Sequence, residues 1–137
     1  MKVFLAALLV IPCLAQKLYV YSEFTRIDPF GAIVALDRGA EPRHILSPGV
    51  PRNAYSSFRV VVQLDKPASF HLDIAQNPET FKATLYKERF EQHGELWIPD
   101  KLEPVPIPYS GTPADFVIPG QKAVTFWLDI WTDRTAQ

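Results

Sequence analysis

The chain has little cysteine, little glycine and almost no net charge. Its 137 residues include one cysteine and six glycines, and 14 basic against 15 acidic side chains leave a net charge of −1. A nucleic-acid-binding protein needs a basic surface to offset phosphate charge, so this balance argues against that class. Because one cysteine cannot form an internal disulfide, the fold has to rely on an apolar core.

Proline is the residue that is unusually frequent. Thirteen prolines argue against a long-helix or coiled-coil protein, since proline fixes φ and lacks a backbone donor. Phosphate-binding glycine loops, nucleophile elbows and zinc-protease motifs do not occur in the sequence. We therefore expect no cofactor. The hydrophobic content of 47% is typical of a globular domain, and the length suits one domain.

The first 15 residues predict a secretory signal peptide. Lys2 precedes an apolar run, and small residues occupy the −3 and −1 positions before Gln16. The run is too short to remain as a membrane anchor. We expect a secreted or periplasmic protein in which residues 16–137 form one domain. Two alternatives are a buried N-terminal strand and a lipoprotein acylated at Cys13.

Alternation of apolar and polar residues predicts that the rest of the chain forms short strands. We expect strands at residues 18–24, 57–64, 69–74, 81–89 and 124–131, a weaker strand at 31–36 and a short extended piece at 43–46. Residues 99–120 are rich in proline and predict a long extended connection, with its prolines at sheet edges or in polyproline-like runs. This pattern predicts an all-β fold, an antiparallel β-sandwich of the immunoglobulin-like kind.

Each of the main strands has one apolar face. These faces comprise Phe58, Val60, Val62 and Leu64, then Phe70, Leu72 and Ile74, then Phe81, Ala83 and Leu85, and finally Val124, Phe126, Leu128 and Ile130. Side chains two residues apart on a strand point to the same side, so these faces are expected to meet in the core.

Few titratable residues suggest catalysis. His44, His71 and His93 are isolated in sequence, so we expect exposed histidines and no metal site. Asp100 and Glu103 lie in the proline-rich stretch. Glycoside hydrolysis needs two carboxylates held about 5–10 Å apart, and such a stretch does not predict that rigidity. No catalytic residue is therefore expected.

The last strand carries the best candidate binding surface. Trp127, Asp129 and Trp131 share one face, and the two indoles are about 13 Å apart if the strand is regular. They form a contact with a neighbouring domain, a stacking platform for a polysaccharide, or ordinary core. If the surface binds a polysaccharide, the Asp129 carboxylate accepts a hydrogen bond from a sugar hydroxyl. Alternatively, this carboxylate pairs with an arginine of a neighbouring strand, such as Arg59.

Several strings together resemble the N-terminal β-sandwich domain of glycoside hydrolase family 123-like secreted bacterial proteins. They are Arg52–Val62, Gln76–Pro78, Trp97–Val105, Ile118–Gln121 and Phe126–Trp131, and the similarity spans about residues 18–134. In that family the sandwich precedes a (β/α)₈ barrel, whose adjacent Asp–Glu pair works with the substrate's acetamido group to cleave N-acetylgalactosaminides. This chain is too short for a barrel of about 250 residues and has no adjacent Asp–Glu pair, so no catalytic residue carries over.

The resemblance also implies a further strand after residues 124–131, where this chain ends at Gln137. We therefore expect a sandwich truncated at its C-terminal strand, or a partner that completes the sheet. The expected function is that of a non-catalytic accessory domain that braces or orients a neighbouring catalytic or scaffold domain. The alternative is a stand-alone carbohydrate-binding module. Neither requires nucleic acid or a membrane span after signal cleavage.

Overall fold

The computed structural model describes residues 16–37 and 50–135. The strands are β1 (Gln16–Ser22), β2 (Ala54–Leu64), β3 (Phe70–Leu72), β4 (Phe81–His93), β5 (Leu96–Val105), β6 (Tyr109–Gly111) and β7 (Ala123–Thr132). Two short 3₁₀ helices, η1 (Ala35–Asp37) and η2 (Pro113–Asp115), join them. The expectation of an all-β, antiparallel fold is confirmed. The predicted signal peptide and the extended piece at 43–46 lie outside the described residues.

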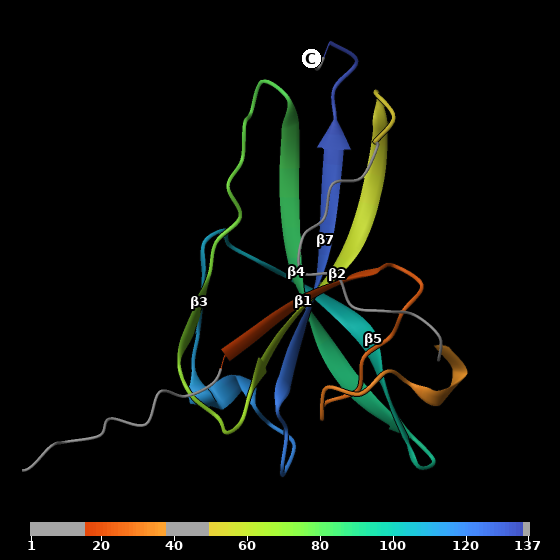
Figure 1. The fold of residues 1–137 in the computed structure, drawn as a ribbon, viewed down its shortest axis with the longest axis vertical. Helices are drawn as coiled ribbons and strands as arrows, with labels where there is room; N and C mark the ends of the chain where they lie inside the picture. Colours follow the sequence, from red (N-terminus) through yellow and green to blue (C-terminus); the bar gives the residue numbers. More distant parts are fainter. Residues whose placement is uncertain (1–15, 38–49, 136–137) are drawn as a thin grey trace, which may run out of the picture.

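The strands form a five-stranded sheet in the order β1-β2-β7-β4-β5 and a two-stranded sheet of β3 and β6 (Figure 1). Every pairing is antiparallel. In Figure 1 β3 lies on one side of the large sheet, and the orange segment that follows β1 lies on the other. Within the described residues, no helix has the length and apolar character to cross a membrane.

The predicted strands are confirmed with shifts at their ends, but two expectations were wrong. Residues 99–105 of the expected connection at 99–120 belong to strand β5, which forms a long hairpin with β4, and residues 109–111 form β6. Pro99 and Pro104 are compatible with a strand there because β5 is an edge strand, as proline requires. The weak strand at 31–36 is reduced to a single bridge, Ile27 with Ile33, followed by η1.

The main core lies between the two sheets. Val60, Val62, Leu85 and Phe126 of the large sheet are buried there, and β3 and β6 cover them. The remaining buried members of this cluster are Leu64, Phe70, Leu72, Ala83, Val124 and Leu128. The predicted apolar faces of β2, β3, β4 and β7 are therefore confirmed for most of their members. Ile74 and Ile130 are only partly buried against this core, and Phe58 and Phe81 lie outside the cluster.

The segment between β1 and η1 covers the other face of the large sheet. Ile27 is fully buried there against Tyr21 and Val61. Arg26 links this segment to η1, because its guanidinium donates two hydrogen bonds of 2.8 Å to the Asp37 carboxylate. These bonds lower the pKa of Asp37, because they favour its ionised form against the opposing effect of burial.

A polar cluster attaches η2 to the large sheet. The Asp115 carboxylate accepts hydrogen bonds from Lys87 Nζ and Tyr109 Oη, both at 2.7 Å, and from the Thr112 backbone at 2.8 Å. Burial opposes ionisation of Asp115, but these donors outweigh it and lower the pKa of the carboxyl. Burial likewise opposes the charge on Lys87, but Asp115 and Tyr109 outweigh it and raise the pKa of Lys87.

Asp115→Asn should lower the free energy of unfolding by about 1.5–3 kcal/mol at pH 7, the range for hydrogen bonds to charged groups. Because the pKa of Asp115 is lower in the folded chain, its carboxylate stabilises the fold above the ordinary range near 4. That contribution is lost as pH falls through the lowered pKa. Urea unfolding of both proteins at pH 7 and at pH 3 measures it. A difference that stays constant between the two pH values would contradict this account.

Candidate functional site: an aromatic face on the large sheet

The candidate site is a group of side chains on β7 and β2. Trp127, Asp129 and Trp131 alternate along β7 on the face opposite the main core. Antiparallel pairing places Ser57 beside Asp129 and Tyr55 beside Trp131. We call these five residues the aromatic face. The structure therefore brings the three predicted residues to one surface and adds two from β2.

Asp129 is held at the centre of the aromatic face by two hydrogen bonds. Its Oδ1 accepts from Ser57 Oγ at 2.6 Å and from Trp127 Nε1 at 2.7 Å. Across residues 16–37 and 50–135, no donor bonds to its second oxygen, Oδ2. The carboxylate therefore fixes the Trp127 indole and keeps an acceptor for a further partner.

The aromatic rings are fixed by neighbours from β2. Trp131 packs on Tyr55 with the ring centroids 4.7 Å apart and the planes tilted by 50°. The Arg59 guanidinium lies over the Trp127 ring, 5.4 Å from its centroid, within cation–π range. Both tryptophans are half-buried, whereas Tyr55 remains 67% exposed. The surface is thus pre-shaped and still accessible.

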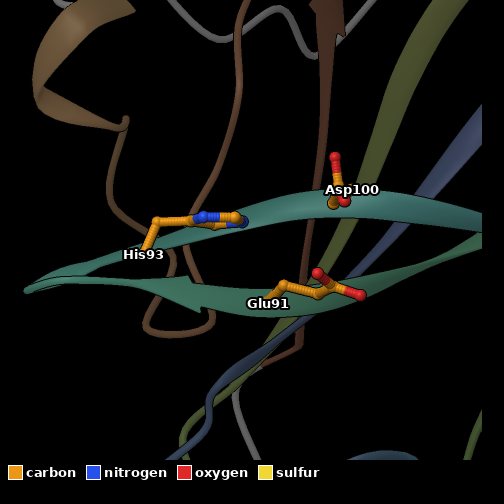
Figure 2. A group of neighbouring side chains, drawn as sticks. All are labelled: Glu91, His93 and Asp100. Carbon is orange, nitrogen blue, oxygen red and sulfur yellow. The ribbon is translucent and has the colours of Figure 1, made fainter.

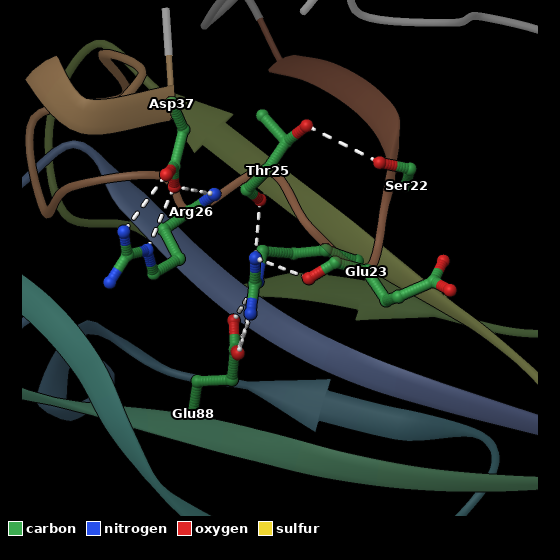
Figure 3. A network of polar contacts seen from close by, with 7 residues as sticks. Ser22, Glu23, Thr25, Arg26, Asp37 and Glu88 are labelled. Atoms are coloured by element: carbon green, nitrogen blue, oxygen red, sulfur yellow. Dashed lines mark hydrogen bonds and ion pairs between the residues drawn. The ribbon is translucent and has the colours of Figure 1, made fainter.

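The salt bridge between Arg59 and Asp129, considered as an alternative from sequence, does not form. Arg59 pairs with Glu88 of β4, with Nε 2.8 Å from Oε2 and Nη2 2.9 Å from Oε1 (Figure 3). Its Nη1 donates to the backbone oxygen of Thr25. Since β7 lies between β2 and β4, this pair reaches across β7 next to Trp127. Side-chain exposures of 4% and 2% show that both charges are buried.

An open groove of about 400 Å³ lies beside the aromatic face. Glu23, Val50, Pro51 and residues 55–58 line it. It follows the edge of β2 beyond the last pair with β1, Ser22 with Phe58. Tyr55 and Ser57 belong both to the groove and to the aromatic face, so a ligand on the face also has a groove to enter.

The other residues considered from sequence lie away from the aromatic face. Glu103 forms an exposed ion pair with Arg89, 2.9 Å apart. His71 is exposed on β3, while Asp100 and His93 are exposed on the hairpin of β4 and β5. His44 lies outside the described residues. The structure thus keeps Asp100 and Glu103 apart from Asp129.

Sequence reasoning missed Tyr55, Ser57 and the partner of Arg59. Tyr55 was missed because the predicted strand began only at Ser57, and Ser57 was missed because nothing in the sequence places it opposite Asp129. Arg59 had a visible signal, because it is a charge between Phe58 and Val60 in an apolar strand. Its partner Glu88 lies 29 residues away and had no such signal.

Comparison of the chain with protein-family models, with curated proteins and with solved structures finds no match.

Proposed function

We propose that this chain is an exported, non-catalytic accessory domain that holds a neighbouring module on its aromatic face. It resembles the N-terminal domain of family 123-like glycoside hydrolases, and we assign it an immunoglobulin-like β-sandwich fold. The observation that carries the proposal is the aromatic face, with Trp127, Trp131 and Tyr55 on one side of the large sheet. Tryptophan, tyrosine and arginine are the residues that most often dominate the energetics of protein interfaces.

The rigidity of the aromatic face supports a binding role. Trp127 is held by Asp129 and Arg59, and Trp131 is held by Tyr55. Side chains that are ordered before binding lose little conformational entropy when a partner arrives. The face can therefore contribute its apolar contact area to affinity.

Two features support the sandwich and the non-catalytic assignment. The small sheet packs on the large one through Phe70 and Leu72, as the second layer of a sandwich does. The buried Glu88 and the mostly buried Asp115 are each paired with a basic side chain. Such pairing suits carboxylates that stabilise a fold.

Trp131→Ala should weaken binding of the neighbouring module about 30-fold, the effect of losing an interface residue worth about 2 kcal/mol. The gene downstream of residue 137 is read first, where the proposal expects an in-frame module, and that polypeptide is the probe titrated by calorimetry. Phe24→Ala is the matched control, because Phe24 is 80% exposed and lies outside the aromatic face. Equal affinity of the Trp131 variant and the unaltered chain would overturn the proposal.

A second candidate function is carbohydrate binding. It is favoured by Asp129 Oδ2, which has an acceptor position to offer a sugar hydroxyl, and by the groove along Tyr55 and Ser57. Indole and phenol rings on either side provide apolar surfaces for the faces of a sugar ring. Ligand sites commonly combine apolar walls with a few polar groups in this way.

Tryptophan fluorescence during titration with soluble polysaccharides separates the two candidates. Two of the three tryptophans belong to the aromatic face, so a bound glycan should change the emission. Asp129→Asn should reduce that response, whereas Asp100→Asn should leave it unchanged. Emission that no polysaccharide alters would remove the second candidate and leave the first standing.

A further inference from the structure

Three side chains that bind metals well lie together on the hairpin of β4 and β5. Glu91 and His93 belong to β4 and Asp100 to β5 (Figure 2). One ligand atom from each lies within 4.8 Å of the other two, and all three residues are exposed. The group is on the face of β4 that carries Leu85, opposite the aromatic face.

The register of the hairpin explains how they meet. Glu91 and His93 are two residues apart on β4 and therefore point to the same side. On β5, Lys101 pairs with Arg89 and Pro99 pairs with Phe90, so Asp100 is an extra residue without a partner. Such a bulge re-aims a side chain that regular pairing would direct elsewhere. Here it places the Asp100 carboxylate beside the two side chains from β4.

In the part of the chain that the structure describes, neither carboxylate forms an ion pair with a lysine or arginine, and the basic side chain beside them is that of His93. The nearest arginine along β4, Arg89, is engaged with Glu103 at 2.9 Å. Glu91 and Asp100 therefore lie close together without a lysine or arginine to compensate their charges. Like charges this close repel each other, so a bound cation between them is favoured.

The donor set selects the kind of cation. One imidazole nitrogen with two carboxylate oxygens suits a transition-metal dication, whereas calcium and magnesium prefer oxygen ligands alone. Zinc binds such atoms at about 2.0–2.2 Å, which puts tetrahedral ligands about 3.4 Å apart. Since the three side chains are exposed, rotation about their side-chain bonds can bring the ligand atoms from their present spacing to the spacing that zinc requires.

We propose that Glu91, His93 and Asp100 form a zinc site that cross-links β4 and β5 near the tip of their hairpin. The three residues supply three ligands, and water completes the tetrahedron. The site is independent of the aromatic face and of the proposed accessory function.

Calorimetric titration of the full chain, made without a histidine tag, with zinc chloride tests the proposal. Saturable one-to-one binding is expected. Removing a residue that only hydrogen-bonds to a metal ligand costs about 10- to 100-fold in metal affinity. Because His93 is itself a ligand, His93→Gln should weaken zinc binding at least about tenfold. Glu91→Gln and Asp100→Asn should weaken it as well. Calcium chloride in excess should not compete.

His71→Gln, His44→Gln and Cys13→Ser are the controls, because they remove every other histidine and the only cysteine of the chain. Each should leave zinc binding unchanged. In the unaltered chain, zinc should shift amide resonances mainly between residues 91 and 100, a result that does not depend on any variant folding. Zinc affinity that survives His93→Gln, shifts centred elsewhere, or no zinc binding at all would each overturn the proposal.

Discussion

Arg59→Met is expected to lower the free energy of unfolding by about 3–5 kcal/mol, the range for removing one partner of a buried ion pair. Glu88 would remain in a site where its side chain is 2% exposed, without the cation that compensates its charge. The backbone oxygen of Thr25 would also lose its donor. Such a loss is a large share of the about 5–15 kcal/mol that stabilises a typical domain. Urea denaturation followed by far-ultraviolet circular dichroism measures it.

Arg89→Met is the matched control for Arg59→Met. Arg89 also pairs with a glutamate, Glu103, but the two side chains are 40% and 42% exposed. Exposed pairs contribute about 0–1 kcal/mol, so this variant should unfold almost as the unaltered chain does. The double variant Arg59→Met/Glu88→Leu should regain most of the loss, because no buried charge is left. Equal effects of Arg59→Met and Arg89→Met would show that burial does not decide the energetics.

Phe126→Ala is expected to cost about 3–5 kcal/mol, because it removes a buried ring and leaves a cavity. Phe126 is fully buried in the main core. Its ring centroid lies 5.2 Å from that of Tyr109 and 6.3 Å from that of Phe70. The loss should therefore also loosen β3 and β6, which pack on the large sheet through these rings.

Phe24→Ala provides the comparison, since it deletes the same side chain where it is 80% exposed. Its effect should fall within the about 0.5 kcal/mol typical of surface substitutions. If the free energy of unfolding falls equally steeply with denaturant concentration in both variants, their denaturation midpoints give the difference in stability. If the two variants proved equally stable, the assignment of Phe126 to the centre of the core would be wrong.

The buried ion pair links stability to the candidate binding surface. Arg59 contacts Glu88 through its hydrogen bonds and Trp127 through its guanidinium plane. Asp129 holds the indole of the same tryptophan by its nitrogen. The orientation of Trp127 therefore depends on residues of β2 as well as β7. A partner on the aromatic face meets a ring whose position the interior of the fold has set.

Much of the fold was predictable because strand alternation is a local property. Val60 and Val62, or Phe126 and Leu128, are two residues apart, and this spacing alone places them on one side of a strand. The hairpin of β4 and β5 was missed because Pro99 and Pro104 suggested a connection. Proline excludes a central strand but not an edge strand, and only the assembled sheet shows that β5 lies at the edge.

The candidate site was predictable only along one strand. Trp127, Asp129 and Trp131 share a face by alternation, so sequence grouped them. Tyr55 and Ser57 come from β2, and Ser57 lies 72 residues from Asp129. No periodicity within one strand indicates which residues of another strand will lie opposite.

The sequence by itself determined that the chain forms strands, and which side of each main strand is apolar, because both follow from neighbours a few residues apart. Only the tertiary structure decided that Arg59 meets Glu88, that Ser57 meets Asp129, and that a bulge brings Asp100 to Glu91 and His93. These contacts between side chains depend on strand order and register. Those are set by how whole apolar faces pack together, which no short stretch of sequence encodes.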